Sequence, residues 1–402
     1  MTSVASPGTD TGAESFDPAF EFQSDHPVPP HQLLLGAIAM GSSVVENGLH
    51  LLRHPYRSQA DFVRGVHQLI SSDPSAESTA FKDIVDGKRN YIEGSDGIQR
   101  DVMVLPGDPD QPGILWLNPW GTRLRSGMIR ASLGEVSSNR PGITIIGMGT
   151  EAIDTVPPSL KWYTDNEVSF ADLGLRRLEA VAEVVANRSD LPHKYVLASE
   201  SMGTIFARRG LQAANAAGFD GIKIIGDIQI SPAGIEEESL FGLGKDFGLP
   251  EFMYLVESIV STPPEKLPYF LKVLLETLPA KPEELAALLK LGVMISHESI
   301  GSDEVEAYGD IPHEIIAGEK DHVAPQQAIL RDFIRRVPNS HLAVYGDEGH
   351  MKLVRYHKMM DRLLRVYDQI TETGQAQAGH TSEGYTFVNS DGTVRPHMLV
   401  AA

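Results

Sequence analysis

Residues 194–210 have the sequence KYVLASESMGTIFARRG, which contains a strand pattern, a small-residue turn and a helix pattern in succession. The apolar run at 195–198 predicts a buried strand, and a helical pattern follows a few residues later. Between the two, Ser201 has small residues two positions before and two positions after it, Ser199 and Gly203. A sharp turn from strand to helix needs small residues there, because the neighbouring backbones nearly touch. Such a turn lifts a serine hydroxyl out of the sheet and points a helix N-terminus at it.

Ser199 is the alternative serine in this turn. Its neighbours two positions away are Leu197 and Ser201. A leucine inside the tight turn would clash with the adjacent backbone, so the pattern favours Ser201 as the serine at its apex.

The composition is that of an ordinary soluble globular protein. The chain has 402 residues, of which 42% are hydrophobic and 22% charged, and it has no cysteine. The absence of cysteine excludes disulfides, thiolate nucleophiles and cysteine-bound metals. A net charge of −20 argues against binding to nucleic acid or to anionic membranes, because both attract Lys and Arg. The start of the chain lacks the basic residues and early apolar core of a signal peptide, so we expect a cytoplasmic protein.

Strand-like runs alternate with helical patterns over most of the chain. Strands are predicted at 99–105, 113–118, 142–148, 195–198, 222–230, 314–317 and 341–345. Helices are predicted at 170–186, 202–217, 326–336 and 353–371. This alternation predicts an α/β protein with a mostly parallel central sheet flanked by helices.

Three helical patterns with no strand between them interrupt the alternation within 235–310, just before the last two of these strands. The third includes Leu285, Leu288, Leu289 and Val293. We expect these helices to form an insertion over the sheet edge. The predicted organisation is an extended arm (1–30), an N-terminal helical segment (31–97), an α/β core (98–234 and 311–372), the helical insertion (235–310) and a tail with a small hairpin turning at Asp391-Gly392 (373–402).

An acid and a histidine follow later strands. A serine hydroxyl becomes a good nucleophile when a base removes its proton, and the base is usually a histidine oriented by an acid. Asp321 follows the strand predicted at 314–317, and His350 follows the one at 341–345, directly after Gly349. The carboxyl ends of parallel strands meet at one edge of the sheet, so both residues are expected near Ser201. Glu319, Asp347 and Asp227 are the other candidate acids.

Over roughly residues 98–372 the sequence resembles the α/β-hydrolase family. The resemblance rests on the serine turn, the Gly318–Asp321 turn, the Gly349–His350 loop, the order Ser, Asp, His, and the insertion where that family carries a helical cap. It implies a serine hydrolase with Ser201 as nucleophile, His350 as general base and acid, and Asp321 as the orienting acid.

The resemblance also implies an oxyanion hole. Its donors would be the backbone N–H groups of Met202 and, in the loop Asn118-Pro-Trp-Gly121, of Trp120. Many family members have His-Gly at that loop, and Pro119 has no N–H to donate. The expected substrate is a small carboxylic ester or related acyl compound. The residues predicted to line the substrate pocket are Trp120, Phe252, Met253, Tyr254, Phe270 and Leu271.

Two other functions are compatible with the sequence. One is an acyltransferase or a lyase on the same fold, acting on a natural-product-like molecule. The other is a binding protein without catalytic activity. No His, Asp or Glu cluster has the spacing of a metal site, and no cofactor is expected. The sequence leaves the oligomeric state open, and a homo-oligomer is compatible with it.

Overall fold

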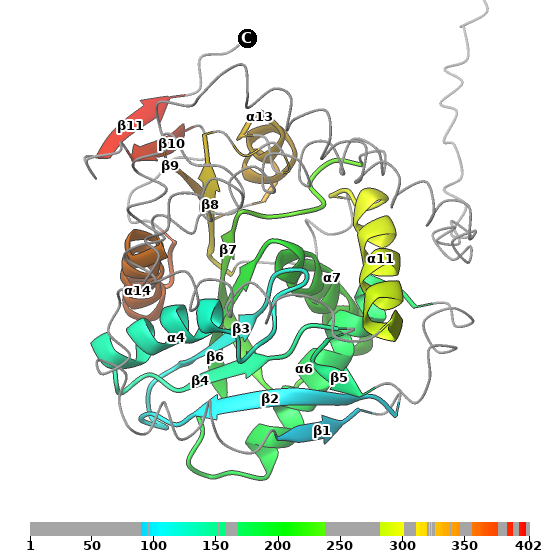
Figure 1. The fold of residues 1–402 in the computed structure, drawn as a ribbon. Coiled ribbons are helices and arrows are strands. Elements are labelled where there is room, and N and C mark those ends of the chain that lie inside the picture. Colours follow the sequence, from blue (N-terminus) through cyan, green and yellow to red (C-terminus); the bar gives the residue numbers. More distant parts are fainter. Residues whose placement is uncertain are drawn as a thin grey trace, which may run out of the picture.

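The protein is described from a computed structural model (Figure 1). The structure describes residues 90–94, 97–151, 153–156, 168–237, 282–300, 311–319, 321, 323, 326–337, 339–345, 356–376, 384–388 and 394–398. The helices are α4 (Gly127–Asn139), α6 (Phe170–Ala186), α7 (Met202–Ala217), α11 (Pro282–Ser296), α13 (Gln326–Ala328), the π-helix η3 (Ile329–Ile334) and α14 (Tyr356–Thr373).

Within this part of the chain the strands form one sheet of eleven. They are β1 (Tyr91–Glu93), β2 (Gln99–Leu105), β3 (Gly113–Leu117), β4 (Ile145–Met148), β5 (Thr155–Val156), β6 (Lys194–Glu200), β7 (Lys223–Ile230), β8 (His313–Gly318), β9 (Ser340–Tyr345), β10 (Gly384–Val388) and β11 (Val394–Met398). Their order is β1-β2-β4-β3-β6-β7-β8-β9-β10-β11, and β5 pairs with β2. Strands β4 to β10 along this order run parallel, whereas β2 is antiparallel to β4 and β11 to β10. The predicted mostly parallel α/β sheet is confirmed.

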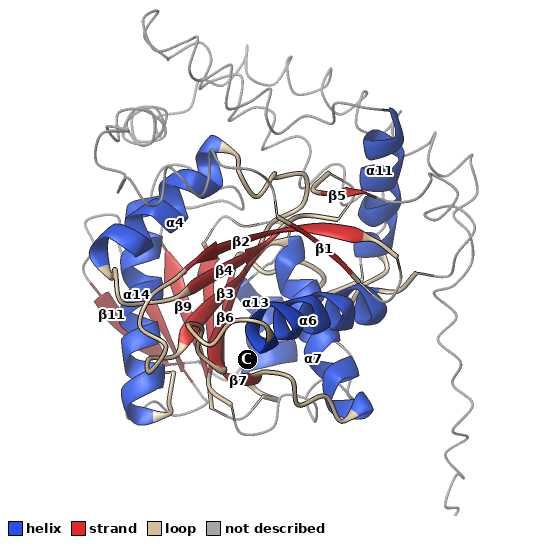
Figure 2. Cartoon of the chain, turned by 90° about the horizontal axis from the view of Figure 1, so that it is seen from below, coloured by secondary structure: helices blue, strands red, loops and turns tan. Residues whose placement is uncertain are grey.

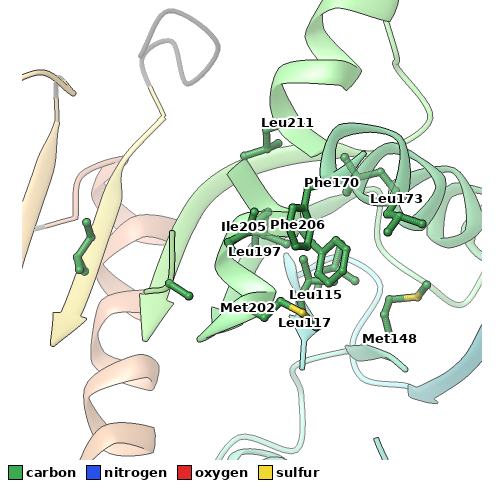
Figure 3. Close-up of a cluster of buried hydrophobic side chains, with 14 of the residues drawn as sticks. Leu115, Leu117, Met148, Phe170, Leu173, Leu197, Met202, Ile205, Phe206 and Leu211 are labelled. Carbon is green, nitrogen blue, oxygen red and sulfur yellow. The ribbon is translucent and has the colours of Figure 1, made fainter. Parts of the chain in front are cut away.

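Helices cover both faces of the sheet (Figure 2). Side chains alternate along β3: Leu115 and Leu117 belong to one buried cluster, and Ile114 and Trp116 to the other. The first cluster includes residues of α6, α7 and α11, and Figure 3 shows part of it. The second includes residues of α4 and α14. A sheet buried on both faces explains why its central strands are apolar runs in the sequence.

All seven predicted strands are present, with small shifts at their ends. Helices α6 and α7 begin and end at the predicted residues, and each end of α14 lies within three residues of the end predicted for that helix. The helix predicted at 326–336 is instead the short α13 followed by η3. A π-helix has hydrogen bonds between residues five apart, and the Arg335 N–H accordingly donates to the Leu330 carbonyl at 3.2 Å.

Two strands and one helix were not predicted from the sequence. β1 lies in the segment predicted to be helical, and β5 and α4 were missed. The tail hairpin is present as β10 and β11, although its predicted turn lies outside the described residues. This hairpin joins the main sheet, because β10 pairs with β9 in parallel. The insertion was predicted to precede the last two strands, but β10 and β11 follow β8 and β9 in the chain.

One helix of the insertion, α11, is described and matches the third predicted pattern. The other two predicted helices, and those of the N-terminal segment, lie outside the described residues. The limits of the predicted domains stay predictions. Among the described helices, none combines the length and apolar character that a membrane span requires.

Candidate active site

Ser201 occupies the turn between β6 and α7 in an unusual backbone conformation. Its φ is 51° and its ψ is −123°, a region that L-residues other than glycine seldom adopt. The residue is 9% exposed and stands at the carboxyl end of the sheet. Ser199, by contrast, is a regular residue of β6, paired with Leu117 and Gln229 and completely buried. The structure therefore has Ser201 and not Ser199 at the apex of the turn.

Hydrogen bonds on both sides of Ser201 hold this conformation. Its N–H donates to the Ile230 carbonyl at the end of β7, at 2.9 Å. Its carbonyl accepts from the N–H of Thr204 at 2.9 Å and from the Thr204 hydroxyl at 2.7 Å. The turn is thus fixed to the neighbouring strand on one side and to the first turn of α7 on the other.

Gly203 brings the start of α7 against the loop that follows β3. A Cβ atom at this position would lie 2.4 Å from the carbonyl oxygen of Leu117 and 2.8 Å from that of Asn118. Real Cβ atoms do not come so close, so only glycine fits here. The requirement for a small residue after Ser201, inferred from the sequence, has this contact as its cause. It sets the Met202 amide, first in α7, beside the loop 118–122.

The loop after β3 is a buried, hydrogen-bonded turn. Asn118 is completely buried, and its side-chain oxygen accepts from the Trp116 indole at 2.7 Å. The Thr122 N–H donates to the Pro119 carbonyl at 3.4 Å, and Gly121 between them has a φ of +72°. A positive φ at the third residue of a turn favours glycine, because glycine has no Cβ atom to clash with the backbone.

The Trp120 side chain points to helix α11. Its indole N–H donates to the Leu288 carbonyl at 3.1 Å. The ring lies against Gly292, where an added Cβ would be 3.3 Å from it. A salt bridge of 2.9 Å between Arg123 and Glu284 ties the same loop to the start of α11. Helix α11 is therefore joined to the loop that lies against Gly203.

Asp321 follows β8 and is 3% exposed. Its side-chain oxygen accepts from the Val323 N–H at 3.0 Å, which closes a local turn. Asp227 is buried within β7, where it pairs with Leu197 and His313, three residues before the strand ends. That is roughly 10 Å from the sheet edge, so Asp227 is not at the serine turn. Glu319 is exposed.

Solved structures have a similar fold. No protein-family model matches the chain, and no curated protein matches it. A thermophilic esterase from Thermogutta terrifontis superimposes with a TM-score of 0.51 at 16% identity, covering 71% of this chain and 100% of its own. A bacterial membrane phospholipase A superimposes with a TM-score of 0.50 at 13% identity, covering 85% and 100%.

The chain has the α/β-hydrolase fold. At this level of identity the likeness concerns the fold alone. The serine turn lies where β6, near the middle of the sheet, meets α7.

Several predicted site residues of this α/β-hydrolase fold lie outside the described residues. They are His350, the competing acid Asp347, and the lining residues Phe252, Met253, Tyr254, Phe270 and Leu271. The geometry between Ser201, His350 and Asp321 is therefore still a prediction. In the described part of the chain, no three His, Asp or Glu side chains come together as a metal site would need.

Arg208, which was not predicted from the sequence, holds the segment after β7 next to the serine turn. It is 2% exposed and lies one turn after Thr204 on α7. Its guanidinium donates to the carbonyls of Ala233 at 2.7 Å and Gly234 at 3.0 Å, and to Gln229 at 3.2 Å. It therefore fixes the segment after β7 that lies beside the serine turn. Arginine is seldom fully buried, and Arg208 stands directly before Arg209 in a helical pattern, so no local signal in the sequence marks it as a buried residue.

Proposed function

We propose that this protein is a serine hydrolase that cleaves a carboxylic ester or related acyl compound. The observation that carries the proposal is the strained backbone of Ser201 at the N-terminus of α7. A non-glycine residue in this conformation is costly, and such strain is concentrated at functional sites. That an esterase and a phospholipase A have the same fold supports the choice of an ester as substrate.

In the proposed reaction His350 takes the proton of Ser201 as the serine oxygen attacks the carbonyl carbon. Asp321 orients His350 and stabilises its positive charge. The tetrahedral intermediate then expels the alcohol, which receives the proton from His350, and an ester on Ser201 remains. A water molecule, deprotonated by His350, attacks this acyl-enzyme and releases the acid and the free serine.

The proposed oxyanion donors are the N–H groups of Met202 and Trp120. Met202 is the first residue of α7, so the helix contains no carbonyl that could accept from its N–H. The helix dipole adds positive potential at the same point. One donor of this kind is worth about 3 kcal/mol of transition-state stabilisation. Trp120 is the candidate second donor, because its loop is pressed against Gly203.

The decisive experiment compares two serine variants with a fluorophosphonate probe, which labels activated serines. Wild-type protein and Ser199→Ala should be labelled and should hydrolyse one member of an ester panel. Ser201→Ala should be unlabelled, with turnover lower by at least about a thousandfold. Ser199 is a matched control, since it is two residues away and its hydroxyl has no partner among the described residues. Labelling that persists in Ser201→Ala would refute the proposal.

Hydrolysis and acyl transfer share the acyl-enzyme and differ in the molecule that attacks it. Product analysis separates them: hydrolysis gives a free acid, whereas transfer gives an acyl group on a second substrate. A labelled Ser201 together with an acylated acceptor would assign the same serine to a transferase. A folded wild-type protein that is never labelled would instead favour a binding function.

A further inference from the structure

The loop after β4 holds the loop after β3 through a set of buried hydrogen bonds. The Asp154 carboxylate accepts from the N–H groups of Leu124 at 2.7 Å and of Thr150 at 3.1 Å, both through one oxygen. The Thr150 hydroxyl lies 2.6 Å from the Thr122 carbonyl and 3.3 Å from the Pro119 carbonyl. The contacted carbonyls belong to the two ends of the turn that contains Trp120.

These groups are shielded from water. Thr150 is completely buried, Asp154 is 1% exposed and Thr122 is 6% exposed. Water therefore cannot replace a lost hydrogen bond at this place. Gly149 permits the arrangement, because a Cβ there would lie 2.4 Å from the Cβ of Asp154. The two loops are thus joined by specific contacts in a dry environment.

Ion pairs with little exposure to water surround the loop that carries Asp154. Arg100 and Arg177 contact Glu151 at 2.9 Å and 3.4 Å, and Arg125 contacts Asp101 at 2.8 Å. Complete burial lowers the pKa of Arg177, whereas Glu151 and Asp154 act to raise it. Asp154 therefore lies near the positive charge of Arg177 while it accepts the two backbone hydrogen bonds.

We propose that Thr150 and Asp154 are positioning residues that aim the Trp120 N–H at the oxyanion of the reaction. This inference rests on the proposed ester chemistry. Neither residue touches substrate in the proposal. They fix the carbonyls of Pro119 and Thr122, and the turn between those two points carries the donor. Since oxyanion contacts act mainly in the transition state, a displaced loop should lower kcat and leave KM nearly unchanged.

Thr150→Val tests this, because valine keeps the shape of threonine and removes the hydroxyl. We expect kcat for the ester found by the panel to fall about 10-fold to 100-fold, with KM changed by less than about twofold. Thr150→Ser restores the hydroxyl and should recover most of kcat. Thr144→Val is the matched control: Thr144 is also completely buried, and its hydroxyl accepts from the Gly107 N–H at 3.0 Å, at the other end of β4. It should keep the wild-type kcat.

Amide hydrogen exchange gives a readout that needs no activity. In Thr150→Val, and in Asp154→Ala, the amides of residues 120–124 should exchange faster than in wild type and in Thr144→Val. Unchanged exchange there, or equal loss of kcat in Thr144→Val, would overturn the positioning role. A wild-type protein that turns over no ester and resists the fluorophosphonate would instead refute the proposed function, and the exchange data would still decide whether Thr150 holds the loop.

Discussion

Two serines at adjacent strand ends have backbone conformations that a side chain disfavours. Ser201 at the end of β6 has a φ of 51°, and Ser231 after β7 has a φ of 45°. Each costs on the order of 1–3 kcal/mol. Hydrogen bonds hold both: Ser201 to Ile230 at 2.9 Å, and Ser231 to the Ile316 carbonyl at 2.7 Å. Two of the three described non-glycine residues with a positive φ therefore lie at the carboxyl ends of β6 and β7, where the proposed nucleophile stands.

Gly203→Ala tests the contact on which the serine turn depends. The new Cβ would lie 2.4 Å from the Leu117 carbonyl oxygen, so α7 and the loop after β3 must separate. We expect a loss of about 1–3 kcal/mol in the free energy of unfolding, measured by urea denaturation. We also expect slower fluorophosphonate labelling, since the proposed donors move apart.

Gly142→Ala is the control for this change. The nearest atoms to its Cβ belong to the Gln111 side chain, at 3.7 Å, so the methyl group has room. Its stability should stay within about 0.5 kcal/mol of wild type. If Gly203→Ala behaved in the same way, close packing of α7 on the loop would not be what positions Ser201.

For single residues, the sequence predicted local structure correctly where a short pattern of residue types has one steric cause. The small residues around Ser201 predicted its turn, and the structure has that turn. The roles of Thr150 and Asp154 could not be inferred, because their partners at 119–124 lie some thirty residues away in sequence. Likewise, nothing local indicates that Ser231 has a positive φ.

Helix α11 contacts the loop that follows β3 at three points along its length. Its Leu288 carbonyl and Gly292 receive the Trp120 side chain, and Glu284 pairs with Arg123. The spacing of 284, 288 and 292 puts these residues on one face of the helix. That face therefore lies on the loop that carries the proposed second oxyanion donor, and a shift of the helix would move the loop.

Trp120→Phe should loosen this element selectively. Phenylalanine keeps an aromatic ring beside Gly292 but cannot donate to the Leu288 carbonyl. The loss of one part-buried hydrogen bond is worth about 1 kcal/mol. Hydrogen exchange in 282–296 should become faster, whereas exchange in α6 and α7 should not change. Unaltered exchange in α11 would mean that packing alone, without the indole bond, holds the helix.

The elements that the sequence predicted well are those with a full apolar face or a buried run. α6 and α7 have buried residues along their whole length and were found with the correct ends. α4 was missed because its segment includes two glycines and a Ser-Ser pair; among its side chains whose burial is described, Ile129, Leu133 and Val136 mark the buried face. β1 and β5 are too short, at three and two residues, to form a pattern.

The whole molecule depends on pairings that local sequence does not encode. The alternation of strands and helices predicted a parallel sheet, because each crossover helix returns the chain to the same edge. The tail hairpin was predicted as a separate feature, yet β10 pairs with β9 through Thr386 to Val388. About forty residues separate the two strands, so only the assembled sheet reveals that the tail belongs to it.

Burial of tyrosines in this assembled core makes the fold sensitive to alkali. Tyr345, at the end of β9, is 3% exposed in the cluster with α14, and burial raises its pKa to about 12. Burial also raises the pKa of Tyr367 on α14 to about 12. A tyrosine ordinarily titrates near pH 10. Between pH 10 and pH 12 the unfolded chain therefore releases these protons while the folded protein keeps them.

Between pH 10 and pH 12 the unfolded state binds fewer protons than the folded state, so the free energy of unfolding falls as the pH rises. The contribution of Tyr345 is fully present below pH 10 and decreases by about 2–3 kcal/mol by pH 12. In Tyr345→Phe, urea denaturation should show a shallower decline over this range. The difference between the two proteins should be constant from pH 7 to pH 9, where neither form of Tyr345 ionises. An equally steep alkaline decline in Tyr345→Phe would assign the effect to other groups, because the phenylalanine variant has no proton to lose at that position.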